Sequence, residues 1–185
     1  KPANLVGASL GGMTSLSLAG DPDYSSLCKT LTMVDIGIYP NQDGSDRIVE
    51  FMRSAENGFS SLEEAADYIS DFLPHREKPK DLSGLHKNLR KKDDRFYWHW
   101  DPKFLQGRQG QDIKEYFGHL EKAANFLNIP TLLIRGGLSD VLTEEDKDYF
   151  LKVVSHAEFE EISNAAHMVA GDKNDIFSKA VEKFL

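Results

Sequence analysis

The sequence contains a single cysteine, Cys28, and no cluster of cysteine and histidine with the spacing of a zinc site. An internal disulfide is therefore excluded, and we expect neither a metal centre nor a cofactor. No run approaches the roughly 18 consecutive apolar residues of a membrane helix, and the first residues lack the layout of a secretory signal. These absences favour a cytoplasmic protein with no membrane partner.

Basic residues are also scarce. Lysine and arginine number 22 against 30 aspartate and glutamate, which gives a formal net charge of −8. Because this charge repels phosphate backbones, nucleic acid is not an expected partner. The chain of 185 residues is 40% hydrophobic, enough for one core of ordinary size, and it has no internal repeats. A folded globular protein is expected.

The first part of the chain follows the order strand, sharp turn, helix. Residues 3–6 predict a short strand, residues 7–12 (GASLGG) a glycine-rich turn, and residues 13–19 a helix. The apolar run at residues 31–34 predicts a second buried strand that ends at Asp35. Two strands with a helix between them indicate the start of a parallel sheet.

The middle of the chain differs in composition and periodicity from the two ends. Between residues 41 and 128 charges dominate, and helical periodicity appears at 47–55 and at 61–72. Ser61 and Glu64 have the spacing of a capping box for the second of these helices. We therefore interpret residues 41–128 as a helical insertion.

The strand pattern returns at residues 130–134, followed by a helix from Thr143, capped with Asp146, to about residue 154. A half-buried strand at 158–162 and a last helix at 174–185 complete the chain. Strands that alternate with helices predict the α/β class, a parallel sheet with helices on both faces. We assign residues 1–40 and 129–185 to this core.

The Gly-x-Ser-x-Gly pattern around Ser9 is typical of a catalytic serine. A strained turn between a strand and a helix exposes the hydroxyl, and we expect Gly7 and Gly11 to keep side chains out of its crowded flanks. The backbone amide of Leu10 would open the following helix, where unpaired amides favour negative charge. We therefore predict Ser9 as a nucleophile and Leu10 as an oxyanion donor.

A serine nucleophile needs a base and an acid that orients it. His167 follows the last predicted strand in a loop of small residues and is the candidate base. Two aspartates follow strands, Asp35 and Asp140. We prefer Asp140, because it follows the later strand in a longer loop. The chain order Ser9, Asp140, His167 matches the order serine, acid, histidine, which supports His167 as the base. Asp35 is the alternative.

Three segments carry a resemblance to a known family: residues 5–12 (LVGASLGG), 129–136 (IPTLLIRG) and 166–172 (AHMVAGD). They resemble the α/β-hydrolase superfamily, most closely its esterase and cofactor-free peroxidase-like branch. The resemblance implies that residues 41–128 form a helical cap, and that a small ester-like substrate is hydrolysed through an acyl-enzyme. A serine nucleophile disfavours the chemistry of the relatives that use aspartate.

Members of this superfamily begin with several strands and a loop that supplies a second oxyanion amide, and the sequence starts after that region. We therefore expect a C-terminal portion of a longer hydrolase, with the N-terminal strands missing. Without them the isolated chain should have little esterase activity. Its uncovered sheet edge should favour self-association.

Candidate substrate contacts are Met168, beside the predicted base, and the aromatic residues Trp98 and Trp100. The alternative for the two tryptophans is ordinary core packing. Two other functions stay open at this point. The fold could serve as a non-catalytic receptor for small molecules, or peroxide could replace water as the acyl acceptor, giving perhydrolase or haloperoxidase-type activity.

Overall fold

The computed structural model describes residues 1–105 and 113–185, with side chains for all of these except 113–116. The described residues form two compact units. The first comprises residues 1–45 and 113–185, and the second comprises residues 46–105. The predicted insertion had wider limits, 41 and 128, and residues 106–112 of it lie outside the described part of the chain.

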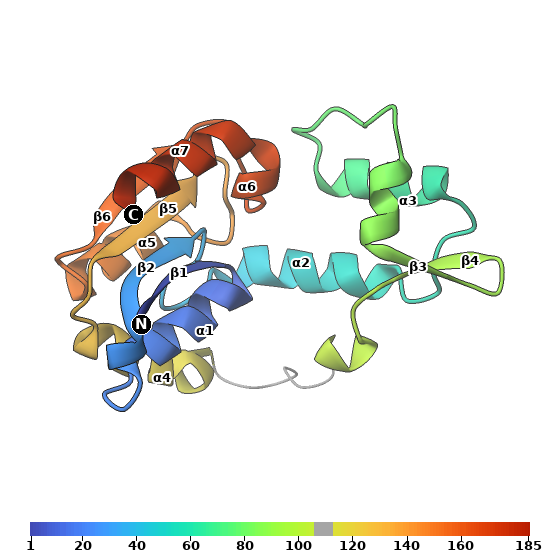
Figure 1. Ribbon diagram of the computed structural model, residues 1–185. Helices are drawn as coiled ribbons and strands as arrows, with labels where there is room; N and C mark the ends of the chain where they lie inside the picture. Colours follow the sequence, from blue (N-terminus) through green and yellow to red (C-terminus); the bar gives the residue numbers. More distant parts are fainter. Residues whose placement is uncertain (106–112) are drawn as a thin grey trace. The chain divides into compact units, whose positions relative to one another are not determined.

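A four-stranded parallel sheet forms the centre of the first unit (Figure 1). Its strands lie in the order β1 (Ala3–Ala8), β2 (Cys28–Val34), β5 (Thr131–Gly136) and β6 (Glu158–Ile162). All neighbouring pairs are parallel, so the carboxyl ends of the four strands lie at the same end of the sheet. The predicted α/β class is confirmed.

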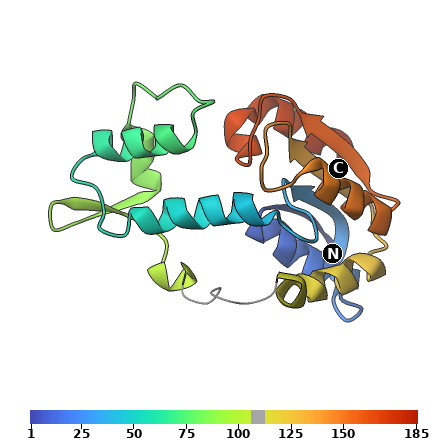
Figure 2. The same ribbon diagram turned by 180° about the vertical axis from the view of Figure 1, so that it is seen from behind.

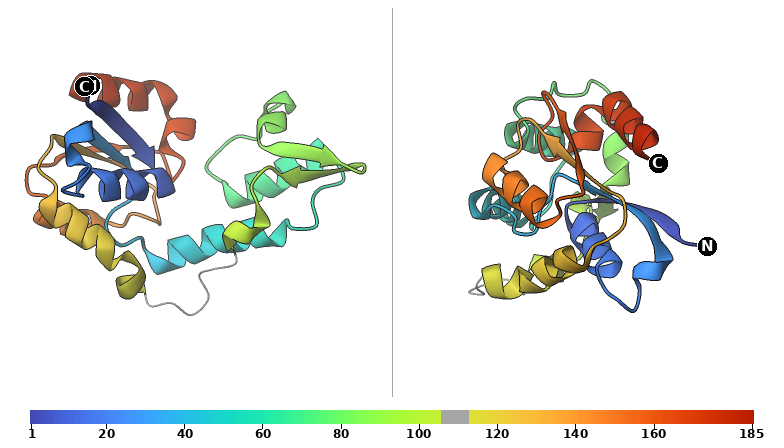
Figure 3. Two further views of the ribbon diagram at one scale, coloured as in Figure 1. Left: turned by 60° about the horizontal axis from the view of Figure 1, so that its bottom comes forward. Right: turned by 90° about the vertical axis from the view of Figure 1, so that its left-hand side faces the viewer.

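Helices cover both faces of this sheet because its strands alternate their side chains between two apolar faces. On one face, Phe177 and Phe184 of α7 (Asn174–Phe184) pack against a cluster that includes Val34, Ile134 and Ile162. On the other face lie α1 (Leu10–Ala19) and α5 (Glu144–Val153) (Figure 3). The view from behind shows α5 in front of the sheet (Figure 2).

Helix α4 (Ile113–Phe126) belongs to the sheet unit, although the sequence prediction placed it in the insertion. It packs on α1 so closely that a Cβ at Gly20 would lie 2.1 Å from the carbonyl oxygen of Ala123. The hydroxyls of Tyr39 and Tyr149 both donate to the carboxylate of Glu121 on α4. An amphipathic pattern reveals an apolar face but not the surface on which it packs, which explains the misplacement.

The second unit is not purely helical, contrary to the prediction. Helix α2 (Gln42–Ser54) begins in the first unit and continues in the second, where α3 (Leu62–Phe72) follows. Strands β3 (Leu89–Lys92) and β4 (Arg95–Trp98) then form an antiparallel hairpin. Its two turn residues have φ of 48° and 56°, the left-handed conformation of a tight hairpin turn. Both are aspartates, Asp93 and Asp94, and without a glycine the turn is hard to recognise.

The short helices complete the chain. They are η1 (Ser25–Leu27), η2 (Ser83–Lys87), η3 (Pro102–Leu105) and α6 (Val169–Asp172). None of the described helices is long and apolar enough to cross a membrane. Strand β1 lies at the edge of the sheet, and its Val6 is 46% exposed. Self-association through this edge stays a prediction.

Glycines allow β1 and α1 to approach closely at the turn between them. A Cβ at Gly7 would lie 2.3 Å from the carbonyl oxygen of Gly11, and one at Gly12 would lie 2.5 Å from Cγ2 of Ile36. A Cβ at Gly11 would meet no described atom within 4 Å beyond its local helix. The crowded positions are therefore Gly7 and Gly12, and the steric role predicted for Gly11 is not found.

Gly7→Ala should destabilise the fold, because its new methyl would press against backbone atoms that cannot move away. We expect a loss of about 1–3 kcal/mol or more in the free energy of unfolding, measured by urea denaturation. Gly11→Ala is the matched control. It adds a methyl in open space on a helix, so stability should be unchanged or rise by up to about 1 kcal/mol. Equal losses in the two variants would contradict this packing.

The packing of α4 should weaken at alkaline pH, because it includes the hydrogen bond from the Tyr39 hydroxyl to Glu121. The hydrogen bond with Glu121 raises the pKa of Tyr39 to about 12, whereas an unfolded tyrosine ionises near pH 10. The stability that this difference contributes is present below about pH 10 and is lost as the pH rises toward 12.

Tyr39→Phe should lower the free energy of unfolding by about 1 kcal/mol at neutral pH and reduce the further loss between pH 10 and 12. Urea denaturation at several pH values measures both effects. Tyr24→Phe is the control, since Tyr24 is 52% exposed. An alkaline loss in Tyr39→Phe as large as that of the wild type would show that Tyr39 is not its source.

Candidate active site

Ser9 occupies the sharp turn between β1 and α1. Its φ of 50° and ψ of −119° are rare for a residue with a side chain, and such strain is commonly found at functional positions. Its amide donates to the carbonyl of Val34 at 3.1 Å, and its own carbonyl receives the amide of Met13 at 3.1 Å. The hydroxyl makes no capping bond with the helix. The backbone is thus fixed on both sides while the side chain is half-buried at the sheet edge.

Leu10 is the first residue of α1, so its amide belongs to the turn whose N–H groups lack helical partners. The first turn of α1 contains no acidic residue. The helix dipole therefore favours a negative charge beside Ser9. The role of the Leu10 amide as an oxyanion donor stays a prediction.

His167 lies in the loop between β6 and α6, with a side chain that is 14% exposed. Its Nδ1 is 2.8 Å from Oδ2 of Asp35, which follows β2 directly. A histidine and an aspartate that are 132 positions apart in the chain thus form a hydrogen-bonded pair.

Backbone contacts hold the histidine loop against the end of β5. The amide of Leu138 donates to the carbonyl of Ala165 at 2.8 Å, and the amide of Ala166 donates to the carboxylate of Asp172 at 2.8 Å. A Cβ at Gly136 would lie 2.4 Å from the carbonyl oxygen of Ala166. Small residues before His167 and a glycine opposite them therefore allow this close approach.

Asp35 is fully buried and occupies the left-handed region, with φ of 53°. Its amide donates to the carbonyl of Ile134 at 2.7 Å. Its Oδ1 accepts the amide of Gly136 at 2.8 Å, and its Oδ2 accepts the hydroxyl of Ser139 at 2.5 Å in addition to the histidine contact. The carboxylate is thus oriented by donors from two other segments of the chain.

The structure pairs the histidine with a different aspartate from the one preferred in the sequence interpretation. The carboxylate beside the histidine Nδ1 is that of Asp35, the alternative in the sequence interpretation, and not that of Asp140. The reason is geometric. Asp35 donates its amide to Ile134 and accepts the amide of Gly136, so it lies against the end of β5, and the loop after β5 turns Ser139 toward it. The backbone carbonyl of Asp140 faces α2, where a Cβ at Gly44 would lie 2.2 Å away.

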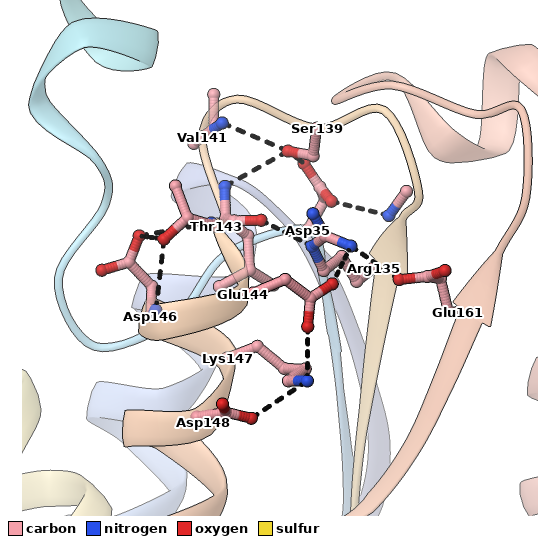
Figure 4. A network of polar contacts seen from close by, with 12 residues as sticks. Asp35, Arg135, Ser139, Val141, Thr143, Glu144, Asp146, Lys147, Asp148 and Glu161 are labelled. Atoms are coloured by element: carbon pink, nitrogen blue, oxygen red, sulfur yellow. Dashed lines mark hydrogen bonds and ion pairs between the residues drawn. The ribbon is translucent and has the colours of Figure 1, made fainter.

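Arg135, at the end of β5, was not singled out from the sequence, although it is only 7% exposed. Its Nε donates to the carbonyl of Leu142 at 2.7 Å, and its Nη1 contacts Glu144 at 2.7 Å and Glu161 at 2.6 Å (Figure 4). This guanidinium ties the loop after β5 to α5 and β6. A charged residue inside a strand between apolar neighbours was the signal that could have identified it.

The first turn of α5 is stabilised in the way the sequence predicted. Thr143 and Asp146 form a complete capping box, which fixes the end of the loop that begins at Gly137. The hydrogen bond from Lys147 and then the positive charge of Arg135 lower the pKa of Glu144. The loop is therefore anchored at both of its ends.

The predicted substrate contacts lie in different parts of the molecule. Met168 follows His167 and is 53% exposed. Trp98 packs on the core of the second unit around Phe59, and its ring stacks on Trp100 with centroids 4.7 Å apart. These contacts agree with the core-packing alternative for the tryptophans, although both also line a small cavity in that unit. Their roles in substrate binding, and that of the second unit as a cap, stay predictions.

Metal ligands do not gather anywhere in the described part of the chain: no group of three or more His, Cys, Asp or Glu side chains is arranged to hold an ion there.

Solved structures with a similar fold include several hydrolases. E-2-(acetamidomethylene)succinate hydrolase matches with a TM-score of 0.81 at 18% identity, over 99% of this chain and 66% of its own. An esterase from Mycobacterium tuberculosis matches with a TM-score of 0.74 at 26% identity, over 98% and 60%. The thioesterase domain of the curacin biosynthetic pathway matches with a TM-score of 0.71 at 17% identity, over 98% and 65%.

The chain thus spans less than two thirds of the length of the similar structures named here. Its sequence matches the family described as alpha/beta hydrolase fold over residues 1–173. That match extends through β1, the whole sheet and the histidine loop. It agrees with the architecture and with the resemblance seen in the sequence, and the chain belongs to the alpha/beta hydrolase fold family.

Proposed function

We propose that the chain carries the catalytic centre of a serine hydrolase acting on carboxylic esters or related acyl substrates. In this proposal Ser9 is the nucleophile, His167 the general base and Asp35 the acid that orients the histidine. The observation that carries it is the 2.8 Å contact between Asp35 Oδ2 and His167 Nδ1. An esterase at 26% identity among the similar structures supports the choice of acyl substrates.

The histidine contact determines which ring nitrogen can act as the base. Asp35 Oδ2 accepts a hydrogen bond, so Nδ1 carries the hydrogen in this pair and Nε2 has a free lone pair for a proton. In the proposed reaction Nε2 takes the hydroxyl proton as Oγ of Ser9 bonds to the substrate carbonyl carbon. The buried carboxylate stabilises the imidazolium that forms.

The remaining steps follow from the same groups. The carbonyl oxygen becomes an oxyanion, to which the amide of Leu10 at the start of α1 donates. As the tetrahedral intermediate collapses, the bond to the leaving alcohol breaks and His167 returns its proton to that oxygen. Water then attacks the acyl-enzyme with the same base, which releases the acid and restores the Ser9 hydroxyl.

In the complete protein, Ser9→Ala should abolish labelling by a fluorophosphonate probe and lower the kcat for short p-nitrophenyl esters by about 10⁴-fold or more. Ser163→Ala, an exposed serine in the loop after β6, is the matched control and should label and turn over as the wild type does. Labelling that persists at another residue of the Ser9 variant would refute the assignment. Binding of esters by the wild type without turnover would indicate a receptor.

The two candidate acids can be ranked by matched amide substitutions. Asp35→Asn should lower kcat by about 10⁴-fold, because the amide favours the wrong histidine tautomer. Asp140→Asn should change kcat by less than about tenfold, since the contact with His167 Nδ1 is made by Asp35. Circular dichroism of both variants checks that they are folded. The opposite ranking of the two kcat values would return the role to Asp140.

A further inference from the structure

Ser139, in the loop after β5, has a hydroxyl whose hydrogen-bonding capacity is completely used. The group donates to Asp35 Oδ2 at 2.5 Å and accepts the amides of Val141 and Leu142, each at 3.2 Å (Figure 4). A serine hydroxyl has one hydrogen and two lone pairs, so two amide donors leave only one direction for its hydrogen. That direction is the carboxylate of Asp35.

Backbone amides that follow it in the loop hold the oxygen of Ser139 in place. The peptide groups at Leu142 are fixed on both sides, because its amide donates to Ser139 Oγ and its carbonyl accepts Arg135 Nε at 2.7 Å. Arg135 in turn bridges Glu144 and Glu161, on α5 and β6. The position of the Ser139 hydroxyl therefore depends on the Leu142 peptide, which the Arg135 guanidinium connects to α5 and β6.

Ser139 and His167 share one oxygen of Asp35. Oδ2 receives both the hydroxyl and the histidine contact, while Oδ1 receives the amide of Gly136. The side-chain torsion that turns an aspartate carboxylate is soft, so its plane depends on its partners. Without the hydroxyl, the amide of Gly136 alone would hold the carboxylate from the side of β5.

We propose that Ser139 is a positioning residue of the active site: its hydroxyl fixes the plane of the Asp35 carboxylate and, through it, the ring of His167. This inference rests on the proposed function. Ser139 touches neither the nucleophile nor the substrate in this role. Its hydroxyl connects the hydrogen bonds of Arg135 and Leu142 to the carboxylate of Asp35.

The test uses Ser139→Ala, Ser139→Thr and the exposed control Ser163→Ala in the protein, with p-nitrophenyl acetate as substrate. Ser139→Ala should lower kcat by roughly 10- to 100-fold with KM nearly unchanged, the size of effect expected for a lost hydrogen bond to a charged group. Ser139→Thr, which keeps a hydroxyl on the same carbon, should recover most of that loss. Ser163→Ala should match the wild type.

A double-mutant cycle separates positioning from a general loss of stability. In the Asp35→Asn background the hydroxyl has no carboxylate to orient, so adding Ser139→Ala should reduce kcat by less than about threefold. The same fold-loss in both backgrounds would overturn the proposal. If Ser139→Ala does not fold, Ser139→Cys, a thiol of similar size and weak donor strength, replaces it with the same expected pattern.

A readout without substrate keeps this test independent of the proposed reaction. The hydrogen-bonded Nδ1 proton of His167 should give a low-field NMR resonance that shifts or broadens in Ser139→Ala and is restored in Ser139→Thr. An unchanged resonance together with an unchanged kcat would overturn the role of Ser139. Absence of Ser9-dependent turnover in the wild type would instead refute the proposed function, while the resonance would still report on Ser139.

Discussion

The buried carboxylate of Asp35 is the group on which the geometry of the candidate site depends. Fully removed from solvent, it would be costly to bury without partners, and it is surrounded by donors. The amide of Gly136 and the hydroxyl of Ser139 come from the end of β5 and its loop, and His167 comes from the loop after β6. One side chain therefore joins segments more than 100 positions away in the chain.

The strand ends around this carboxylate repeat one backbone pattern. The residue leaving each strand donates its amide to a carbonyl near the end of the next strand: Ser9 to Val34, Asp35 to Ile134, and Gly137 to Ile162. Ser9 and Asp35 both have positive φ, a conformation that costs energy for residues with side chains. The sheet holds both in this conformation at the carboxyl ends of two neighbouring parallel strands.

The positions of Ser9 at a strand-to-helix turn and of His167 in a strand-end loop were predictable because their signals are local. The glycine-rich turn identifies Ser9, and His167 is recognised by small residues after the last strand. The choice between Asp35 and Asp140 was not local, since both follow strands and β5, which precedes Asp140, is the strand beside β6. The path of the loop after β5 separates them, because it brings Ser139 to Asp35 and the carbonyl of Asp140 toward Gly44. The same limit applied to residues 113–126, which were assigned to the insertion because the local sequence does not show that this segment packs on α1.

The most direct measurement of the central claim is a crystal structure of the protein with a phosphonate bonded covalently to Ser9. The proposed mechanism predicts a phosphonate oxygen within hydrogen-bond distance of the Leu10 amide, with Nε2 of His167 facing the serine oxygen and Asp35 at Nδ1. The role of Asp35 would be contradicted if Nδ1 of the histidine were paired with Asp140, or if the phosphonate were bonded to another residue.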